Sequence, residues 1–453
     1  MRVGHPRSTL ATSSQFPPAP EPSKPLTHGL THPSTEGNEK AAAPRALPQA
    51  LFEVCLKLEE RGISTWSQGE GLLDDLRPPN SAPPTTTEPR STRSLLCQAN
   101  SRELLEILPR AVVTASQARR LTLATEAGPI DLLPIGCGAL EEGLLAFGLS
   151  SFAFAYRPTE ECWCDPVGAR ATFDAGFLDI SVSEPNPFDV APRRYWIAAR
   201  LMSERSLEPS ARLLEAAHAA LPGAIDRLPQ AAPARREVSR ILASAAPERG
   251  LAFLRESGVS SALFPGMDPA GEARIAHLGP LPALRWAAWL HGSEIQRALV
   301  RLRVPPPLAR RIERIHRTHP IDRRVESLRE VGVRKILGRL GQNEIDGLFV
   351  WRRLELAAAP ASEETRIRST RLDEIEAMFE EVRSHQARSG HIRSLALDGK
   401  AVMAALGAGP GPHVGRALAH LANFVEAQAE ANEPEALERE LADWAAKNAD
   451  SIG

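Results

Sequence analysis

The sequence is poor in aromatic residues and has no long hydrophobic segment. Phe, Trp and Tyr make up only 5% of the 453 residues. No apolar run approaches the roughly 20 residues that a membrane-spanning helix requires, and the N-terminus lacks the apolar stretch of a secretory signal. The sequence therefore predicts neither a membrane protein nor a secreted one.

Cysteine is also scarce, and its five occurrences are odd in number and irregular in spacing. This pattern predicts neither a disulfide framework nor a paired zinc site, and it agrees with a reducing cytoplasm. Cys162 and Cys164 lie two residues apart, on one side of an expected strand. Because no second pair of cysteines accompanies them, we interpret them as small buried side chains.

The residues that are abundant favour helices. Ala, Leu, Arg and Glu dominate, 43% of the residues are apolar, and the length accommodates roughly three domains. The formal net charge is only −2, but positive charge is concentrated locally. Residues 301–340 contain twelve Arg or Lys and four acids. This segment is a candidate phosphate-facing basic band.

The periodicity of the chain predicts an α+β protein. Residues 1–44 are rich in Pro, Ser, Thr and Gly and are expected to be disordered. A small α/β domain with short strands is expected to end near residue 170, and beyond Pro192 nearly every segment reads as an amphipathic helix as far as Asn448. The expected strands are 111–114, 121–125, 130–133 and 152–156.

The segment 394–418 has an unusual order of glycine and proline residues. Asp398 is expected to cap a short helix, the glycines from 407 to 411 to end it, and Pro412 to open a second helix. One face of this second helix is apolar, with residues Val414, Leu418, Leu421 and Val425.

This segment resembles the tail of tRNA nucleotidyltransferases and bacterial poly(A) polymerases, and the resemblance extends over about residues 46–445. It implies a nucleotidyltransferase-like α/β head followed by an all-helical neck, body and tail. The expected boundaries are 45–170 for the head, 171–266 for the neck, 267–380 for the body and 381–453 for the tail. Members of this family add CCA or AMP from CTP or ATP to RNA 3′ ends, with Mg²⁺ held by carboxylates.

The triphosphate turn of that family is incomplete here. Gly69 and Asp74 match the family pattern, but Glu70 replaces its second glycine and Leu73 replaces its arginine. A carboxylate beside the turn repels a nucleotide, and the loss of the guanidinium removes a bidentate phosphate ligand.

The two metal-binding aspartates of the family are missing as well. Their positions fall on Thr92 and Ser94 by one count and on Ser81 and Pro83 by the other, and neutral hydroxyls do not replace carboxylates for a hard divalent cation. The third carboxylate survives as Asp131. Asp131 and Asp74 are therefore catalytic remnants, and no cofactor is expected unless the protein is active, in which case Mg²⁺ is required.

The base-selecting helix of the neck is also altered. Arg194 and Arg200 match the family, whereas Val190, Ala191 and Ile197 stand at positions of functional acid or arginine residues. The resemblance leaves Gly69, Arg194 and Arg200 as remnants of a nucleotide-binding site.

Two histidine-containing segments resemble metal sites only superficially. Trp286 to His291 resembles a helix of metal-dependent phosphohydrolases, but Gly292 stands where an aspartate is needed. His316 and His319 lie three residues apart in the basic band, where we expect them to face solvent or phosphate. The sequence predicts no metal site.

Three functions follow, in order of preference. The first is an RNA-binding pseudoenzyme, with tRNA or another RNA as partner. The second is an active nucleotidyltransferase that binds nucleoside triphosphate and uses displaced carboxylates, and the third is a helical scaffold for protein partners. The candidate RNA-binding residues are basic side chains of the band and the tail: Arg310, Arg311, Arg314, Arg317, Arg323, Arg324, Lys335 and Lys400.

Overall fold

The computed structural model describes most of the chain after residue 43. The described ranges are 44, 47–76, 93–115, 120–136, 140–182, 184–228, 231–324, 330–427 and 431–448. The segment 1–44, expected to be disordered, lies outside the described residues except for Pro44, and Thr92, Ser81 and Pro83 also lie outside them. The head, neck, body and tail boundaries stay predictions.

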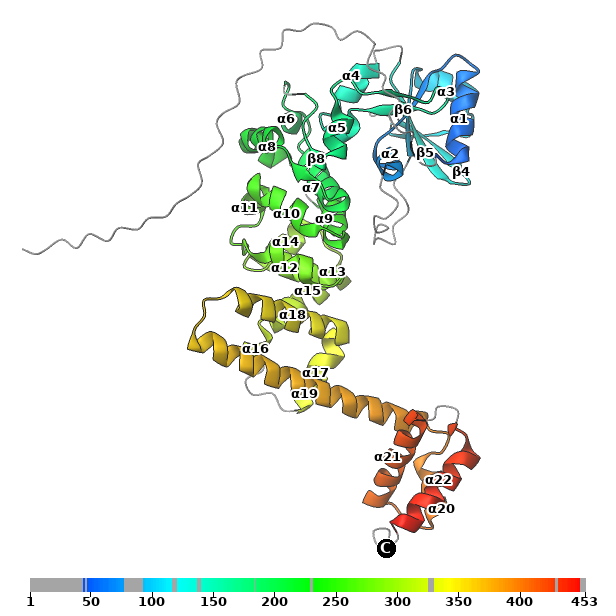
Figure 1. Cartoon of the computed structure of the whole chain (residues 1–453), viewed down its shortest axis with the longest axis vertical. Coiled ribbons are helices and arrows are strands. Elements are labelled where there is room, and N and C mark those ends of the chain that lie inside the picture. The colour runs from blue at the N-terminus through cyan, green and yellow to red at the C-terminus, as the bar shows by residue number, and fades with distance from the viewer. Residues whose placement is uncertain are drawn as a thin grey trace, which may run out of the picture. The chain divides into compact units, whose positions relative to one another are not determined.

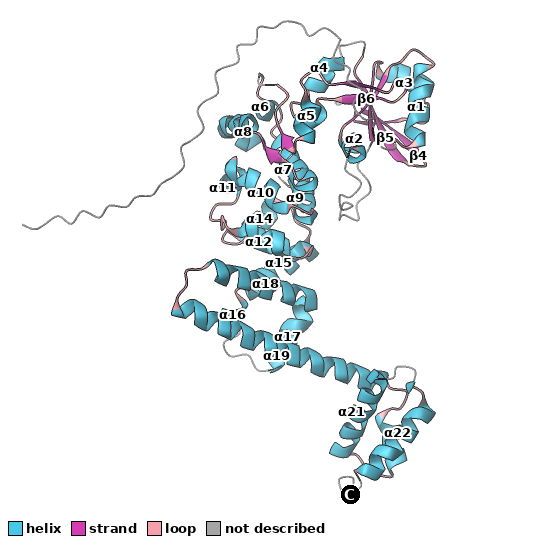
Figure 2. Cartoon of the chain, in the orientation of Figure 1, coloured by secondary structure: helices cyan, strands magenta, loops and turns pink. Residues whose placement is uncertain are grey.

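The N-terminal part contains a mixed sheet, drawn in magenta in Figure 2. Its seven strands lie in the order β3-β4-β5-β2-β1-β6-β7. Strands β2 and β5 are parallel, and the other neighbouring pairs are antiparallel. Cys162 and Cys164 of the last strand are half-buried, which is less than the sequence led us to expect. The strands are β1 Thr65–Gln68, β2 Arg93–Cys97, β3 Val112–Ala115, β4 Arg120–Thr125, β5 Gly128–Pro134, β6 Ala155–Arg157 and β7 Cys162–Cys164.

Helices α1 (Gln49–Glu59) and α3 (Ser101–Ile107) share one hydrophobic core with the sheet. Leu51 and Leu58 of α1 and Leu104 of α3 are buried together with strand residues. Helix α3 begins with a capping box, in which the Asn100 side chain accepts two backbone N–H groups and Glu103 accepts the N–H of Asn100.

Helix α2 (Glu70–Asp75) follows β1 directly and belongs to a different core. Its residues Leu72 and Leu73 are buried in the large cluster that continues into the helices after residue 190. The remaining short elements of this part are α4 (Leu140–Leu145), the 3-10 helix Ser150–Phe152 and α5 (Ala169–Asp174). Part of the expected strand 152–156 is therefore 3-10 helix, and the strand itself begins at Ala155.

Beyond Pro192 most of the described residues are helical, as the sequence predicts, and a two-residue strand interrupts the helices. This strand, β9 (Glu208–Pro209), pairs in parallel with β8 (Phe177–Leu178). The first helices are α6 Pro187–Val190, α7 Arg194–Arg205, α8 Ala211–Ala224, α9 Ala232–Ala243, α10 Pro247–Glu256 and α11 Val259–Leu263.

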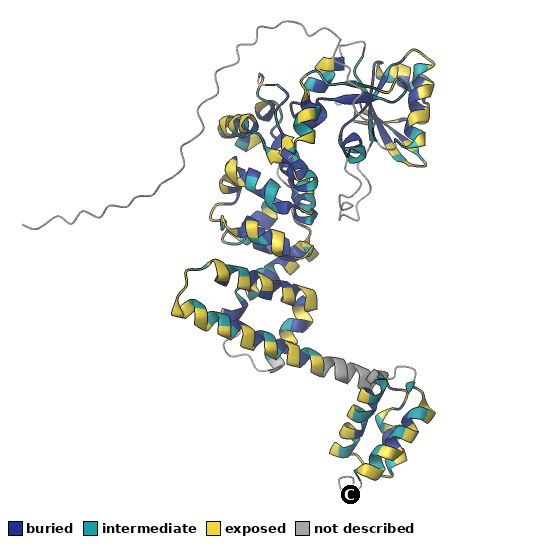
Figure 3. Cartoon of the chain, viewed as in Figure 1, coloured by how far each residue is buried: buried dark blue, intermediate teal, exposed yellow. Residues whose placement is uncertain are grey.

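The next helices continue the same core, and buried positions recur along them (Figure 3). This core includes the buried rings of Trp286, Trp289 and Trp351. They are α12 Gly271–His277, α13 Pro282–Trp289, α14 Ile295–Arg301, α15 Pro306–Thr318, α16 Ile321–Arg324, α17 Glu330–Leu340, α18 Gln342–Ala358 and α19 Glu363–Ser394. The side chains of residues 324, 330, 331 and 385–394 lie outside the description.

The last three helices form a core of their own, at the red end of the chain in Figure 1. They are α20 (Gly399–Leu406), α21 (Pro412–Ala427) and α22 (Pro434–Lys447). The expected cap is present, since the Asp398 carboxylate accepts the N–H of Ala401 at 2.8 Å. The predicted start of α21 at Pro412 and its apolar face are confirmed. None of the helices in the described ranges is both long and apolar enough to cross a membrane.

The packing of α7 against α10 depends on the absence of a side chain at Gly250. A Cβ atom there would lie 2.0 Å from the Ala199 carbonyl oxygen and 2.2 Å from Ser203 Oγ. We therefore expect Gly250→Ala to lower the free energy of unfolding by about 1–3 kcal/mol or more. A urea titration followed by tryptophan fluorescence measures this change.

Gly338→Ala in α17 is the matched control, because no atom lies within 4 Å of a Cβ atom built there. This control should stabilise the protein by about 0.5–1 kcal/mol. Equal midpoints for the two variants would contradict the packing argument.

Candidate functional site

The centre of the sheet brings Ser94 and Asp131 side by side. Ser94 of β2 is the register partner of Asp131 in β5 and of Gln68 in β1. The resemblance implies a metal-binding carboxylate at the position of Ser94, which offers only a hydroxyl group. One carboxylate and one hydroxyl are a poor ligand set for two divalent cations.

The Asp131 carboxylate is already engaged by protein groups. It accepts a hydrogen bond from Thr122 Oγ1 at 2.7 Å and lies 3.4 Å from the Arg120 guanidinium, while the residue is only 9% exposed. Among the described residues, no group of three His, Cys, Asp or Glu side chains gathers around Asp131.

The turn after β1 carries an acid that faces the helices of the next part of the chain. Gly69 adopts a φ of +82°, which favours glycine, and precedes α2. Both oxygens of Glu70 contact the Arg200 guanidinium, one of them at 3.0 Å, and Glu70 also lies 3.2 Å from Arg240. Burial favours the protonated form of Glu70, but Arg200 and Arg240 outweigh it and lower its pKa.

Arg200 is the centre of a buried ion-pair network. Its side chain is 3% exposed and contacts three carboxylates, namely Glu70, Glu204 at 2.9 Å and Glu237 at 2.5 Å. Burial opposes the charged form, but these three acids raise the pKa of Arg200. The guanidinium that the resemblance assigns to a nucleotide is thus fully occupied by the protein.

The other remnants are occupied in the same way. The Asp74 carboxylate lies 2.5 Å from the Arg205 guanidinium. Arg194 donates hydrogen bonds to the carbonyl oxygens of Pro187 and Ala146, at 2.5 and 2.8 Å. The Asp74–Arg205 pair joins α2 to α7, and Arg194 joins α7 to α6 and to the segment after α4.

The basic band lies mainly on α15 and α17. Arg310, Arg314 and Lys335 are exposed, and within the described ranges the Arg314 guanidinium bonds to the carbonyl oxygens of Arg310 and Arg339. Because these partners are neutral carbonyl oxygens, they do not compensate the positive charge of Arg314.

Not every predicted member of the band is available in this way. Arg311 forms an ion pair with the buried Glu344, and Arg317 lies 3.7 Å from Glu313. Arg323 is exposed on α16, and the side chain of Arg324 lies outside the description. Lys400 is exposed on α20, among the last three helices.

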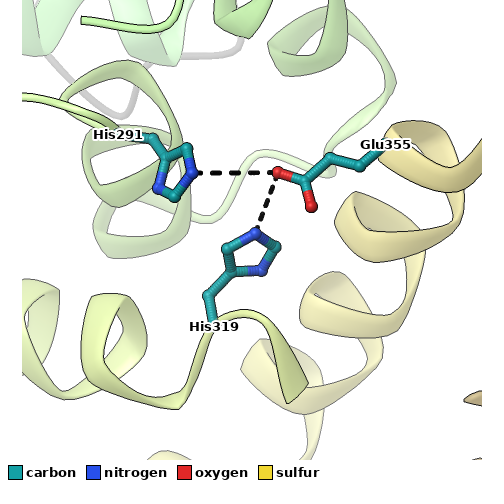
Figure 4. A group of neighbouring side chains, drawn as sticks. All are labelled: His291, His319 and Glu355. Carbon is teal, nitrogen blue, oxygen red and sulfur yellow. Dashed lines mark hydrogen bonds and ion pairs between the residues drawn. The ribbon is translucent and has the colours of Figure 1, made fainter. Parts of the chain in front are cut away.

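A second cluster joins residues that belong to separate motifs in the sequence. His291 follows α13, His319 follows α15, and Glu355 lies on α18; the three side chains point toward one another (Figure 4). His319 Nε2 lies 2.9 Å from Glu355 Oε1, and His291 Nε2 lies 4.0 Å from the same oxygen. Sequence reasoning misses Glu355 because its segment has no local motif that sets it apart from other helical acids.

The expectation that His319 faces solvent or phosphate is wrong, because the residue is only 3% exposed. Burial lowers the pKa of both His291 and His319, despite the neighbouring carboxylate. Burial favours the protonated form of Glu355, but hydrogen bonds from His319 and from Arg352 outweigh it and lower its pKa to about 2. His319 is further held by stacking on Trp351, with ring centroids 3.6 Å apart. The cluster therefore combines two imidazoles with one carboxylate.

The Arg200 network generates a stability prediction. Removing one partner of a buried ion pair typically costs about 3–5 kcal/mol, because it leaves buried charge uncompensated. Arg200→Met leaves three carboxylates close together, so we expect a loss of this size in the free energy of unfolding, measured by urea titration.

The control is Arg297→Met, which removes the exposed pair with Glu294. Both of its side chains are 75% exposed, so the change should cost no more than about 1 kcal/mol. If both variants unfold at the wild-type urea concentration, the buried network contributes no stability.

Comparison with known proteins identifies the fold. No family model and no curated protein matches the sequence. Among solved structures, the chain resembles the Bacillus stearothermophilus CCA-adding enzyme in complex with CTP, with a TM-score of 0.54, 17% identity and coverage of 89% of this chain and 98% of that one. It resembles the Thermotoga maritima CCA-adding enzyme complexed with tRNA at a TM-score of 0.54 and 16% identity, covering 88% of this chain and 96% of that one.

A third structure, a tRNA nucleotidyltransferase complexed with a primer tRNA and an incoming ATP analog, matches at a TM-score of 0.53 and 14% identity, over 72% of this chain and 99% of that one. At these identities the likeness establishes architecture. The chain has the α+β fold of the CCA-adding enzymes, a mixed-sheet domain followed by helices.

Proposed function

We propose that this protein binds the 3′ region of tRNA or of another RNA in the cytoplasm and does not transfer nucleotides to it. The observation that carries the proposal is the state of the ancestral site. Its remaining charges are paired with protein groups, as Glu70 with Arg200, Asp74 with Arg205 and Asp131 with Arg120.

The site does not fit the Mg²⁺ that the fold implies. A magnesium ion requires several oxygen ligands and is bound through carboxylates and substrate phosphates. Asp131 is held by Thr122 and Arg120, and its strand neighbour is Ser94. A cation bound to Asp131 would therefore have to displace the Arg120 guanidinium.

The nucleotide itself also meets an obstacle. A triphosphate at the turn would bring negative charge next to Glu70, and it would compete with three carboxylates for Arg200. Those carboxylates belong to the same folded chain as the Arg200 guanidinium. They therefore lose less entropy on binding it than a free anion would.

RNA binding is supported by the exposed cations of the basic band. Arg310, Arg314 and Lys335 are exposed on α15 and α17, two helices that contact each other. Cations that face solvent neutralise phosphates and release their counterions when RNA binds. Two of the structures with the same fold are complexes with tRNA.

A transfer and retention assay tests the proposal. We would incubate the purified protein with tRNA lacking its CCA end, Mg²⁺ and labelled CTP and ATP, with an active CCA-adding enzyme in parallel. We expect the tRNA to be retained by the protein without incorporation of label. Incorporation would establish an active nucleotidyltransferase instead, and the absence of retention would favour a helical scaffold for protein partners.

The salt dependence of binding identifies the surface. In the triple variant with Arg310, Arg314 and Lys335 changed to Gln, we expect weaker tRNA binding at every salt concentration. The slope of log K against log salt should become shallower by about one for each phosphate that the variant no longer neutralises. Fluorescence anisotropy with labelled tRNA measures both quantities.

The matched control changes three exposed arginines that lie outside the band and are paired with nearby acids: Arg102, Arg297 and Arg366 to Gln. This control removes the same charge and should bind nearly as the wild type does. Equal losses in the two triple variants would reject the basic band as the RNA-binding surface.

A further inference from the structure

We propose that His291, His319 and Glu355 bind a divalent transition-metal ion of the zinc type. This site is independent of the nucleotidyltransferase-like site and of the proposed RNA binding. It lies among the helices that follow residue 280, and its ligands come from three separate segments of the chain.

The chemistry of the donors is that of a zinc site. Two imidazole nitrogens and one carboxylate oxygen suit Zn²⁺ and its neighbours in the first transition series, whereas Mg²⁺ and Ca²⁺ prefer oxygen ligands alone. Sets of two His and one Glu occur in zinc sites that keep a fourth position for water.

The positions of the donor atoms are close to what a metal needs. The three ligand atoms all lie within 4.8 Å of one another. Ligands of a tetrahedral zinc ion lie about 3.4 Å apart, given bond lengths near 2.1 Å. Glu355 Oε1 is 2.9 Å from His319 Nε2 and 4.0 Å from His291 Nε2, so small side-chain rotations reach this geometry.

Neighbouring residues fix two of the three ligands. The other Glu355 oxygen accepts a hydrogen bond from Arg352 Nη1 at 2.9 Å, which orients the carboxylate. Trp351 stacks on the His319 ring with an interplanar angle of 8°. The third side chain, that of His291, is 29% exposed, so the cluster has a side that solvent and ions can reach.

The Arg274 guanidinium competes with the metal for one oxygen of Glu355. Arg274 Nη1 lies 3.5 Å from Glu355 Oε1, the same oxygen that faces both histidines. Its shorter ion pair, at 2.5 Å, is with Asp268. Metal binding therefore requires Arg274 to withdraw toward Asp268, and removal of the arginine should strengthen metal binding.

Cobalt and zinc titrations of the untagged, chelator-stripped full-length protein test the proposal. We expect one equivalent of Co²⁺ to give the visible absorption of a tetrahedral nitrogen and oxygen site, and Zn²⁺ to displace it. His291→Gln and Glu355→Gln should each weaken binding at least tenfold. Changing a residue that only hydrogen-bonds to a metal ligand already weakens metal binding by about tenfold or more, and these two residues are ligands themselves. Arg274→Gln should bind more tightly than the wild type.

The control is His277→Gln, which changes an exposed histidine of α12 and should leave cobalt binding unchanged. Circular dichroism verifies that each variant is folded, and His291→Gln is decisive because its side chain is the most exposed of the three. Absence of cobalt absorption in the wild type would overturn the proposal. So would a His291→Gln variant that binds cobalt as tightly as the wild type.

Discussion

The contact between the Arg200 guanidinium and three carboxylates is the constraint on which the arrangement of this site depends. Arg200 is almost fully buried, and a buried charge is tolerated only when nearby groups of opposite sign compensate for its lost hydration. Glu70 supplies part of that compensation from the turn after β1, while Glu204 and Glu237 supply the rest from α7 and α9. Arg200 therefore joins the turn after β1, in the sheet-containing part of the chain, to the helices that follow.

This constraint gives a physical meaning to a change that the sequence presents only as a loss. Where the resemblance expects a glycine at a triphosphate turn, the chain has Glu70, and the retained Arg200 binds it. A carboxylate and a phosphate make similar bidentate contacts with guanidinium. The Glu70 carboxylate of the protein itself thus supplies the negative charge that compensates the Arg200 guanidinium.

The architecture is largely predictable from the sequence, and the partners within the site are not. Helix starts such as Asp398 and Pro412, and the apolar face of α21, depend on residues a few positions apart, so local pattern is sufficient. Strands β1 and β2 escape prediction because they contain only four and five residues and carry no long alternating pattern. The pairing of Glu70 with Arg200 joins positions 130 residues apart, and no local pattern encodes such a contact.

The surroundings of the histidines are likewise not predictable from local sequence. What a histidine can bind depends on its neighbours in the fold. The sequence places His319 in the basic band because its neighbours along the chain are arginines. In the fold it is stacked on Trp351 and bonded to Glu355, so it faces a carboxylate and an aromatic ring instead of solvent. Arg311 is a related case, since it remains exposed but its charge is compensated by Glu344, whereas the carbonyl partners of Arg314 are neutral. A count of positive residues along a sequence therefore overestimates a phosphate-binding surface whenever acids from distant segments pack against those residues. The exposed cations with neutral partners are the ones that retain their attraction for phosphate.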